Sequence, residues 1–320
     1  INAQPERAES GLYVFLEKAE TTRLFLRETT RVPPAALLLF GAVLVRTAWL
    51  AEDAFITFRT IDNFVHGYGL TWNVAERVQA YSNPLWMFLV VPFYWLSGEI
   101  YYTVVLLSVG VSLAALWVCC TRFAASGPSA LLAGCVLVCS KAFTDYSTSG
   151  LENPLTHLLL ALFYALYLDR WQRRETIFWL SLLAALATVN RLDAILLFAP
   201  ALGYALWWHR GGVAVCGLGF APLVLWELFS LVYYGFPFPN TAYAKLGTGV
   251  PFGDRLSHGV AYLLNSLRVD LLTPLATAAG LVAAGRSRDR AAWALAAGGV
   301  LYLLYVVYIG GDFMSGRFLA

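Results

Sequence analysis

Acidic and basic residues that could act in catalysis stand next to long apolar stretches of this sequence. Glu52 and Asp53 come directly after the first apolar stretch, and Arg59 follows six residues later. A carboxylate at such a boundary can act as general base towards a hydroxyl group, and two carboxylates can hold a divalent cation. Aspartate also caps helix N-termini well, so Asp53 has a structural interpretation as an N-cap that does not exclude the functional one.

Further charged residues stand in short polar segments later in the chain. Glu152 lies in TSGLENP, where Asn153 and Pro154 have the pattern of a cap followed by the first helical position. A turn alone does not require an acidic residue there, so Glu152 is a candidate site carboxylate. In NRLD, Arg191 and Asp193 form a local ion pair, or Arg191 contacts a phosphate group.

Two more segments complete the set of candidate site residues. The loop YYGFPFPNTAYAKLG carries Tyr243 and Lys245, which suits stacking on a sugar beside a lipid phosphate, or an aromatic belt at a membrane interface. GGDFMSGR carries Asp312 and Arg317 between glycines, which could also simply end the last apolar segment. The four histidines are scattered and form no HExxH motif or catalytic triad, so nothing supports a hydrolase with such a nucleophile.

The elements that must position these residues are apolar helices. The chain has 320 residues, of which 59% are hydrophobic and 13% charged, and it contains 11 Trp and 17 Tyr. This composition is typical of an all-α, polytopic membrane protein and not of a soluble globular domain. The net charge of +2, spread along the chain, gives no support to a nucleic-acid partner.

Nine segments are candidates for membrane spans. They cover residues 34–51, 101–121, 128–143, 154–169, 176–190, 194–208, 213–234, 260–284 and 291–309. Residues 84–96 are also apolar, but as a helix they would cover only about 20 Å, and they contain Pro92. If 84–96 is a re-entrant or surface-lying helix, the larger share of Lys and Arg falls on the side of the N-terminus, as cytoplasmic loops require. We therefore predict about nine spans and a cytoplasmic N-terminus, with the motif-bearing loops on the extracytoplasmic face.

Two other parts of the chain have distinct patterns. Residues 1–33 are polar and carry both signs of charge, as a cytoplasmic tail or an interfacial helix would, and residues 34–320 form the membrane module, which we expect to be truncated at its C-terminus. From Asp53 to Val65, apolar residues recur with helical spacing before two glycines. This pattern predicts an amphipathic helix on the membrane surface in the first external loop.

The same polar segments resemble a known family. Seven blocks in order are similar to motifs of the GT-C class glycosyltransferases related to the mycobacterial terminal β-(1→2)-arabinofuranosyltransferase and to the pilin arabinosyltransferase and flagellar motor control (ZomB-like) proteins. The blocks are EDAFITFR (52–59), GYGLTWN (67–73), ERVQAYSNPLW (76–86), STSGLENPL (147–155), NRLD (190–193), YYGFPFPNTAYAK (233–245) and GGDFMSGR (310–317).

The resemblance implies a GT-C fold and the transfer of a sugar, arabinofuranose in the named relatives, from a polyprenyl-phosphate donor without a nucleotide. The acceptor would be a glycan or a protein at the extracytoplasmic face of the bacterial plasma membrane. The family's acidic pair maps onto Glu52 and Asp53, the pair at which we consider a divalent ion (Mg, Mn or Ca), although Glu52 stands where the family has Asp. Its basic residues map onto Arg59, Arg191, Lys245 and Arg317.

A mechanism follows from the residue types. Arg191, Lys245 or Arg317 would hold the phosphate of the leaving group at headgroup level. Asp53, helped by Glu52, would orient or deprotonate the acceptor hydroxyl. The residues expected to contact the donor are Arg59, Glu152, Arg191, Asp193, Tyr243, Lys245, Asp312 and Arg317.

Three expectations concern the lipid and the competing classes of function. Segments 54–66 and 84–96 would flank a groove for the polyprenyl tail, in contact with membrane lipids. A transporter stays an alternative, with Arg46 and Glu227 inside apolar segments as markers of a pathway. A non-enzymatic component of a surface appendage or flagellar motor system is the other alternative, and turnover of a lipid-linked sugar separates an enzyme from a scaffold.

Overall fold

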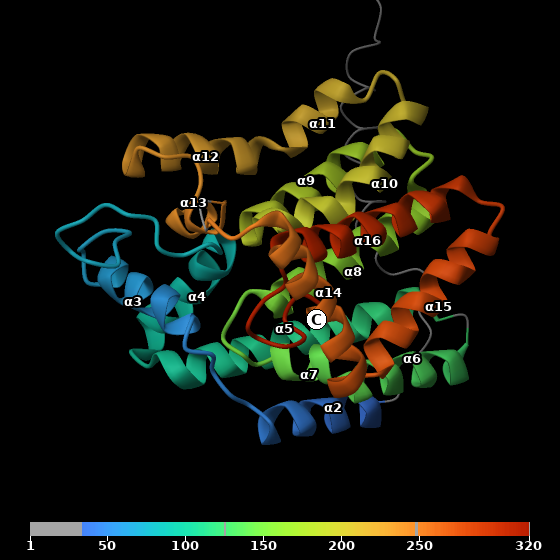
Figure 1. The fold of residues 1–320 in the computed structure, drawn as a ribbon, viewed down its shortest axis with the longest axis horizontal. Coiled ribbons are helices and arrows are strands. Elements are labelled where there is room, and N and C mark those ends of the chain that lie inside the picture. The colour runs from blue at the N-terminus through green and yellow to red at the C-terminus, as the bar shows by residue number, and fades with distance from the viewer. Residues whose placement is uncertain (1–33, 125, 247–248, 320) are drawn as a thin grey trace, which may run out of the picture.

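A computed structural model describes residues 34–124, 126–246 and 249–319, and every regular element in these segments is a helix (Figure 1). The all-α prediction is therefore confirmed, whereas the predicted tail at 1–33 lies outside the described residues. The α-helices are α2 (Pro34–Arg46), α3 (Ala54–Val65), α4 (Pro84–Ser97), α5 (Ile100–Arg122), α6 (Gly127–Cys139), α7 (Lys141–Tyr146), α8 (Asn153–Arg170), α9 (Thr176–Asn190), α10 (Ile195–Trp208), α11 (Val213–Gly219), α12 (Ala221–Tyr234), α13 (Asn240–Leu246), α14 (Phe252–Val269), α15 (Leu272–Arg286) and α16 (Arg290–Ile309), with a 3-10 turn η1 (Leu192–Ala194).

Only some of the predicted spans have the length that a bilayer requires. In the described part of the chain, α5 with 23 residues and α16 with 20 residues are long and apolar enough to cross a membrane. Two bent pairs pass the same test if each is one broken span: α11 with α12, bent by 54°, and α14 with α15, bent by 109°. These helices mark a membrane protein. The nine predicted spans are not confirmed, because α2, α6, α9 and α10 are short apolar helices of 13 to 15 residues.

The corner between α14 and α15 interrupts the predicted span at 260–284. Asp270 lies at this corner, and its buried carboxylate accepts hydrogen bonds from the backbone N–H of Ala142 in α7 (2.7 Å) and from the hydroxyl of Thr273 (2.7 Å). These hydrogen bonds compensate the buried carboxylate for the water that it loses. The carboxylate therefore holds the bend against α7.

The first loop contains the two short helices that its pattern predicts. Helix α3 buries Phe58 and Ile61 and leaves Arg59 and Asp62 exposed, so its amphipathic character is confirmed. Gly67, with a φ of +83°, follows its end in a conformation that glycine adopts without strain. Helix α4 contains Pro92, has 14 residues and packs between α3 and α5.

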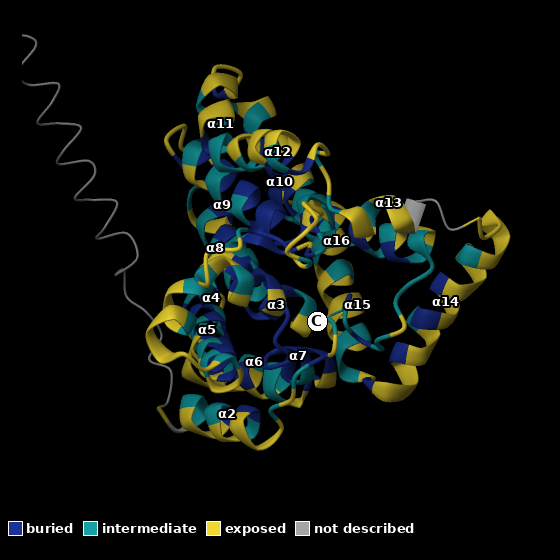
Figure 2. Cartoon of the chain, turned by 90° about the vertical axis from the view of Figure 1, so that its left-hand side faces the viewer, coloured by how far each residue is buried: buried dark blue, intermediate teal, exposed yellow. Residues whose placement is uncertain are grey.

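The main core joins α3 and α4 to α8, α9 and α10, and α16 packs against α10. The rings of Phe163 in α8 and Phe198 in α10 meet edge to face, with centroids 4.8 Å apart. A Cβ on Gly298 of α16 would lie 2.3 Å from the carbonyl oxygen of Leu197, so glycine permits the close approach of α16 to α10. The outer helices α12, α14 and α15 bury few or none of their residues (Figure 2).

Candidate functional site

Four of the predicted site residues meet around Arg317. Its Nη1 lies 3.0 Å from Oδ2 of Asp53 and 3.5 Å from Oδ2 of Asp312, and its Nη2 lies 3.8 Å from Oε1 of Glu152. The side chains of Glu152 and Asp312 are 4% and 6% exposed, whereas that of Asp53 is 33% exposed. Asp53 is therefore the carboxylate of this Arg317 cluster that is most open to an incoming molecule.

Three segments far apart in the sequence form the Arg317 cluster. Asp53 directly precedes α3, Glu152 directly precedes α8, and Asp312 and Arg317 follow α16. The end of the chain returns to the middle of the molecule, beside α7 and α14 (Figure 1). The sequence placed all four residues in loops on one face of the protein, and the structure brings them into contact.

The segment after α16 is held in one conformation by glycine and by hydrogen bonds. Gly311 has a φ of +73°, and a Cβ there would lie 2.6 Å from the ring of Tyr262. The backbone N–H of Phe318 donates to the hydroxyl of Tyr262 (3.0 Å), and Nδ2 of Asn153 donates to the carbonyl oxygen of Arg317 (3.2 Å). Arg317 is therefore fixed by its backbone as well as by its ion pairs.

The predicted cap at Asn153 is wrong, and Asp53 occupies the N-cap position of α3 without capping it. The Asp53 side chain makes no cap hydrogen bond, and its carboxylate binds Arg317. The residue before α8 is Glu152, and Asn153 is already helical, with Pro154 in the second helical position. Both side chains turn to the returning C-terminal segment, which offers Asp53 a guanidinium and Asn153 a carbonyl oxygen.

A relay of hydrogen bonds from α3 holds Glu152. The hydroxyl of Thr57 donates to Oδ1 of Asn83 (3.0 Å), and Nδ2 of Asn83 donates to Oε2 of Glu152 (3.2 Å). Thr57 lies four residues after Asp53, so α3 reaches Glu152 both through Arg317 and through Asn83. Neither Thr57 nor Asn83 is among the site residues predicted from the sequence. Asn83 before Pro84 has the pattern of a helix cap, although its side chain makes no cap hydrogen bond.

Arg191 and Asp193 form a buried ion pair beside the Arg317 cluster. The contact is bidentate, with Nε to Oδ1 at 2.9 Å and Nη2 to Oδ2 at 3.2 Å. The guanidinium carbon lies 4.6 Å from the ring centroid of Phe318, and the hydroxyl of Tyr302 donates to Asp193 (3.2 Å). Burial lowers the pKa of Arg191, but the charge of Asp193 outweighs it, so the pKa lies above its ordinary value. The ion-pair interpretation is confirmed, and a phosphate contact stays a prediction.

The other predicted site residues do not join the Arg317 cluster in the described structure. Glu52 is exposed, and Arg59 lies on the exposed face of α3. The ring of Tyr243 packs against Phe236 in its own loop, with centroids 5.7 Å apart. Lys245 belongs to α13, but its side chain lies outside the described part of the structure.

The loop that carries Tyr243 nevertheless contacts the first loop. The backbone N–H of Asn240 donates to the carbonyl oxygen of Gln79 (3.0 Å), and the buried hydroxyls of Tyr81 and Tyr234 lie 2.8 Å apart. Residues 76–86 and 233–245, two of the motif blocks, are therefore neighbours in space.

The predicted metal ligands do not fit a metal ion in this conformation. Glu52 is exposed, while Asp53 is bound to Arg317. Over the residues that the structure describes, no group of three or more His, Cys, Asp or Glu is arranged to hold a metal.

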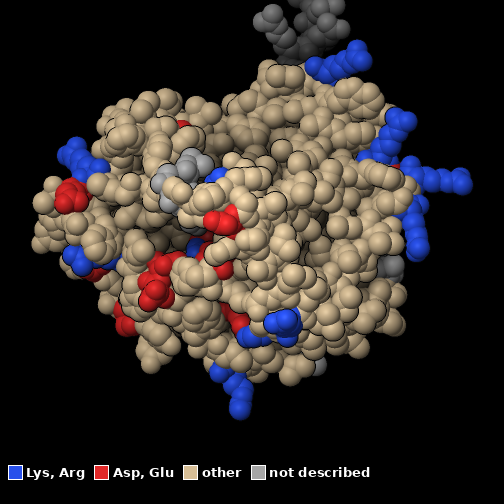
Figure 3. Space-filling view, viewed as in Figure 1, with Lys and Arg blue, Asp and Glu red and all other residues tan. Residues whose placement is uncertain are grey.

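The Arg317 cluster is negatively charged overall. Its three carboxylates and one guanidinium leave a formal charge of −2. Figure 3 shows acidic atoms gathered around a hollow on this face, with basic atoms inside it. Such surroundings disfavour a phosphate, but ionised carboxylates accept hydrogen bonds from hydroxyl groups. Such a group of carboxylates therefore suits a ligand that carries hydroxyl groups.

Two curated proteins are similar to the chain, both described as terminal β-(1→2)-arabinofuranosyltransferase. The protein from Mycobacterium tuberculosis is 29% identical over 89% of this chain and 52% of its own length. The protein from Corynebacterium glutamicum is 25% identical over 85% of this chain and 46% of its own length. The chain thus spans about half the length of these relatives, and the resemblance seen in the motifs is confirmed. No protein-family model and no solved structure matches it.

Proposed function

We propose that this chain is the membrane module of a GT-C type arabinofuranosyltransferase. It transfers arabinofuranose from a polyprenyl-phosphate donor to a glycan or protein acceptor at the extracytoplasmic face of the plasma membrane. The names of the two relatives support the reaction class. The observation that carries the proposal is the Arg317 cluster, in which motif residues from three segments share one arginine.

Asp53 acts as the general base. It is the most exposed carboxylate of the cluster, and Arg317 contacts its Oδ2, which leaves Oδ1 for the acceptor. The acceptor hydroxyl donates its proton to Asp53 as its oxygen forms the bond to the anomeric carbon. At the same time the bond from that carbon to the phosphate oxygen breaks, and the lipid phosphate leaves with the electron pair.

Glu152 and Asp312 keep Arg317 in position for this step. Both are almost fully buried, and each is held by a second hydrogen bond, from Asn83 to Glu152 and from the backbone N–H of Met314 to Asp312 (3.2 Å). A guanidinium between three carboxylates can hardly rotate away from Asp53. The base is therefore oriented before the acceptor arrives.

The phosphate of the donor needs a cation outside the negative surroundings of the cluster. Arg317 already contacts three carboxylates, and Arg191 donates two hydrogen bonds to the carboxylate of Asp193. The third predicted phosphate ligand is Lys245. Because the two arginines are occupied by carboxylates, we assign the phosphate contact to Lys245. The contact between Asn240 and Gln79 supports it, because it places the α13 segment next to the first loop.

The direction of the core helices supports an extracytoplasmic site. Helix α8 begins at the Arg317 cluster and ends at the arginine-bearing connection 170–175, and α16 runs the opposite way. Nη2 of Arg174 donates to the carbonyl oxygen of Gly211 (3.0 Å), so the connections 170–175 and 209–212 are neighbours. Because arginine-rich connections collect on the cytoplasmic side, we assign the Arg317 cluster to the opposite side.

The test is transfer of radiolabelled arabinose from synthetic polyprenyl-phosphoryl arabinofuranose in membranes that contain the full-length protein. Asp53→Asn should lower kcat by roughly 10²- to 10⁴-fold, the usual contribution of a general base. Asp254→Asn, at an exposed acid outside the motif blocks, is the matched control and should retain wild-type transfer.

Two results would contradict the proposal. A correctly inserted Asp53→Asn protein that keeps most of its activity would remove Asp53 as the base. A wild-type protein that transfers neither arabinose nor any other sugar from a panel of polyprenyl phosphates would indicate a transporter or a scaffold.

A further inference from the structure

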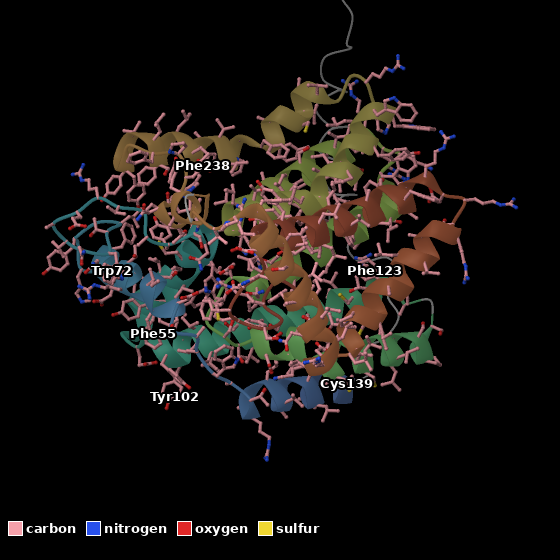
Figure 4. The ribbon with its side chains drawn as sticks, viewed as in Figure 1. Phe55, Trp72, Tyr102, Phe123, Cys139 and Phe238 are labelled. Atoms are coloured by element: carbon pink, nitrogen blue, oxygen red, sulfur yellow. The ribbon has the colours of Figure 1, made fainter. Side chains whose placement is uncertain are left out.

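A second recess lies along α3, on the side that faces α4 and the start of α5. It has a volume of about 400 Å³ and opens to the surface. Its walls are Phe55, Phe58, Arg59, Asp62, Tyr94 and Ile100. Phe55, Phe58, Arg59 and Asp62 belong to α3. Their spacing of three or four positions places them on one face of the helix. Figure 4 places Phe55 and Trp72 at the same edge of the molecule, next to α3.

The polar groups of this α3 recess are oriented by neighbours and retain binding capacity. The hydroxyl of Tyr94 donates to Oδ1 of Asp62 (2.5 Å), and Nδ1 of His66 lies 3.1 Å from the same oxygen. Nε of Arg59 donates to the carbonyl oxygen of Trp72 (2.9 Å), and the guanidinium lies over the Trp72 ring at 4.8 Å. These contacts leave Oδ2 of Asp62 as an acceptor and both Nη groups of Arg59 as donors.

We propose that the α3 recess binds the glycan acceptor, holding the sugar residues next to the one that reacts. This inference rests on the proposed function. A sugar presents a face of C–H groups and a rim of hydroxyls that both donate and accept hydrogen bonds. Phe55, which is 54% exposed, supplies an aromatic surface for that face. Asp62 accepts and Arg59 donates the hydrogen bonds that the hydroxyls need.

The position of the α3 recess along the helix links it to the proposed base. Asp53 directly precedes α3, Phe55 lies in its first turn, and Asp62 lies nine residues after Asp53. At 1.5 Å per residue, Asp62 is about 14 Å from Asp53 along the helix axis. At 3.6 residues per turn, these nine positions make about two and a half turns, so Asp62 lies on the opposite side of α3 from Asp53. An acceptor whose terminal hydroxyl reaches Asp53 therefore passes round the N-terminal end of α3, over the exposed Phe55, before it enters the recess.

A polyprenyl tail, which the sequence suggested between α3 and α4, matches these walls poorly. Hydrocarbon in the α3 recess would remove water from Arg59 and Asp62 without replacing its hydrogen bonds, which is unfavourable. Exposed apolar residues outside the recess, among them Trp95 and Leu96 of α4, offer hydrocarbon a surface without that cost. The charges therefore favour a hydroxylated ligand.

The first test is direct binding of a synthetic arabinofuranose tetrasaccharide to the full-length protein in nanodiscs, followed by saturation-transfer NMR. Phe55→Ala and Asp62→Asn should each raise the Kd by roughly tenfold, the effect of losing one charge-assisted hydrogen bond or a comparable contact. Phe93→Ala is the matched control, because Phe93 is a similarly exposed aromatic residue, 47%, that does not line the recess. Its Kd should equal that of the wild type.

The second test separates acceptor from donor in the transfer assay. The two recess variants should raise the KM for the tetrasaccharide by roughly tenfold and leave the KM for the lipid donor within roughly twofold of the wild type. A rise in the donor KM alone would assign the recess to the prenyl tail and overturn the inference. Unchanged Kd and KM values for the tetrasaccharide would overturn it as well.

The two proposals fail in different ways. If the wild type binds the tetrasaccharide, the recess variants weaken that binding and no sugar is transferred, the glycan site stands and the proposed function falls. If the wild type transfers arabinose but binds the tetrasaccharide without any effect of the variants, the proposed function stands and the glycan site falls. A wild type that neither binds nor transfers would overturn both.

Discussion

Most arginine residues at the two ends of α8 and α16 lie in opposite surroundings. The exception is Arg170 at the end of α8, which is 16% exposed and lies 2.9 Å from Asp169. At the end where α8 stops and α16 starts, Arg210 and Arg288 are exposed. Arg173 is 56% exposed, and its contact with Glu175 is long, at 4.0 Å. At the other end, the side chains of Arg317 and Arg191 are 13% and 10% exposed and are enclosed by carboxylates and aromatic rings. Figure 3 shows the same contrast between the basic atoms that project from one edge and the acidic hollow.

The difference teaches which arginines can support chemistry. Exposed ion pairs contribute only about 0–1 kcal/mol, because water solvates each partner well. Removal of one partner from a buried pair costs about 3–5 kcal/mol, because the other charge is left without compensation. An arginine in a connection is therefore not a site by itself; its surroundings decide whether it orients other groups. The first end fits membrane orientation, and the second fits catalysis.

The largest effect is expected for Arg317→Met at the buried end. This substitution keeps much of the side-chain volume and removes the charge. Three carboxylates would face each other without a cation, so we expect a loss of about 3–5 kcal/mol in the free energy of unfolding and no measurable transfer. Thermal unfolding of the protein in nanodiscs measures the first effect. The matched control is Arg288→Met at the exposed end, whose melting temperature should stay near that of the wild type.

An intermediate effect is expected where the relay to Glu152 is cut. Asn83→Ala removes the donor to Oε2 of Glu152, and loss of a donor to a buried acceptor costs about 1–3 kcal/mol. Thr57→Val removes the hydrogen bond to Asn83 and should lower kcat. Thr57→Ser keeps the hydroxyl and should have a kcat close to that of the wild type. Melting temperature and the ratio of kcat to KM are the readouts. If valine and serine at position 57 gave the same kcat, Thr57 would only fill space.

The smallest effect on stability is expected at the exposed end. Replacement of Arg286, Arg288 and Arg290 by Gln should change the free energy of unfolding by less than about 0.5 kcal/mol. It should instead weaken the preference for one membrane orientation. In a variant without native cysteines, a membrane-impermeant thiol reagent should label Phe313→Cys from outside intact cells and should not label Ser287→Cys. Neutralisation of the arginines should make part of the Ser287→Cys population accessible, and the reverse labelling pattern would contradict our topology.

The helices could be predicted from the sequence because their signals are local. Each of the nine apolar segments contains a helix, and the amphipathic α3 and the short α4 lie where the pattern placed them. The errors occur where distant residues decide. In the predicted span 34–51, the helix already ends at Arg46. The predicted span 260–284 is broken at Asp270, whose carboxylate accepts a hydrogen bond from the backbone N–H of Ala142 in a distant part of the chain.

The candidate site could be predicted only as a set of residues. Asp53, Glu152, Asp312 and Arg317 stand out because charges are rare beside apolar stretches. Their pairing, and the participation of Asn83, could not be read from the sequence. Local patterns even suggested different contacts, since aspartate or asparagine before a helix most often caps it.

The sequence by itself determined that this protein is a bundle of apolar helices in a membrane and that its motif residues stand at the ends of those helices. Apolar length, helical spacing and glycine positions are local properties, and each helix satisfies its own backbone hydrogen bonds. Only the tertiary structure decided that Asp53 pairs with Arg317, which is 264 residues away, and that Glu152 is held by Asn83. Such contacts depend on how the helices pack and where the connections return, and they turn scattered charges into one oriented site.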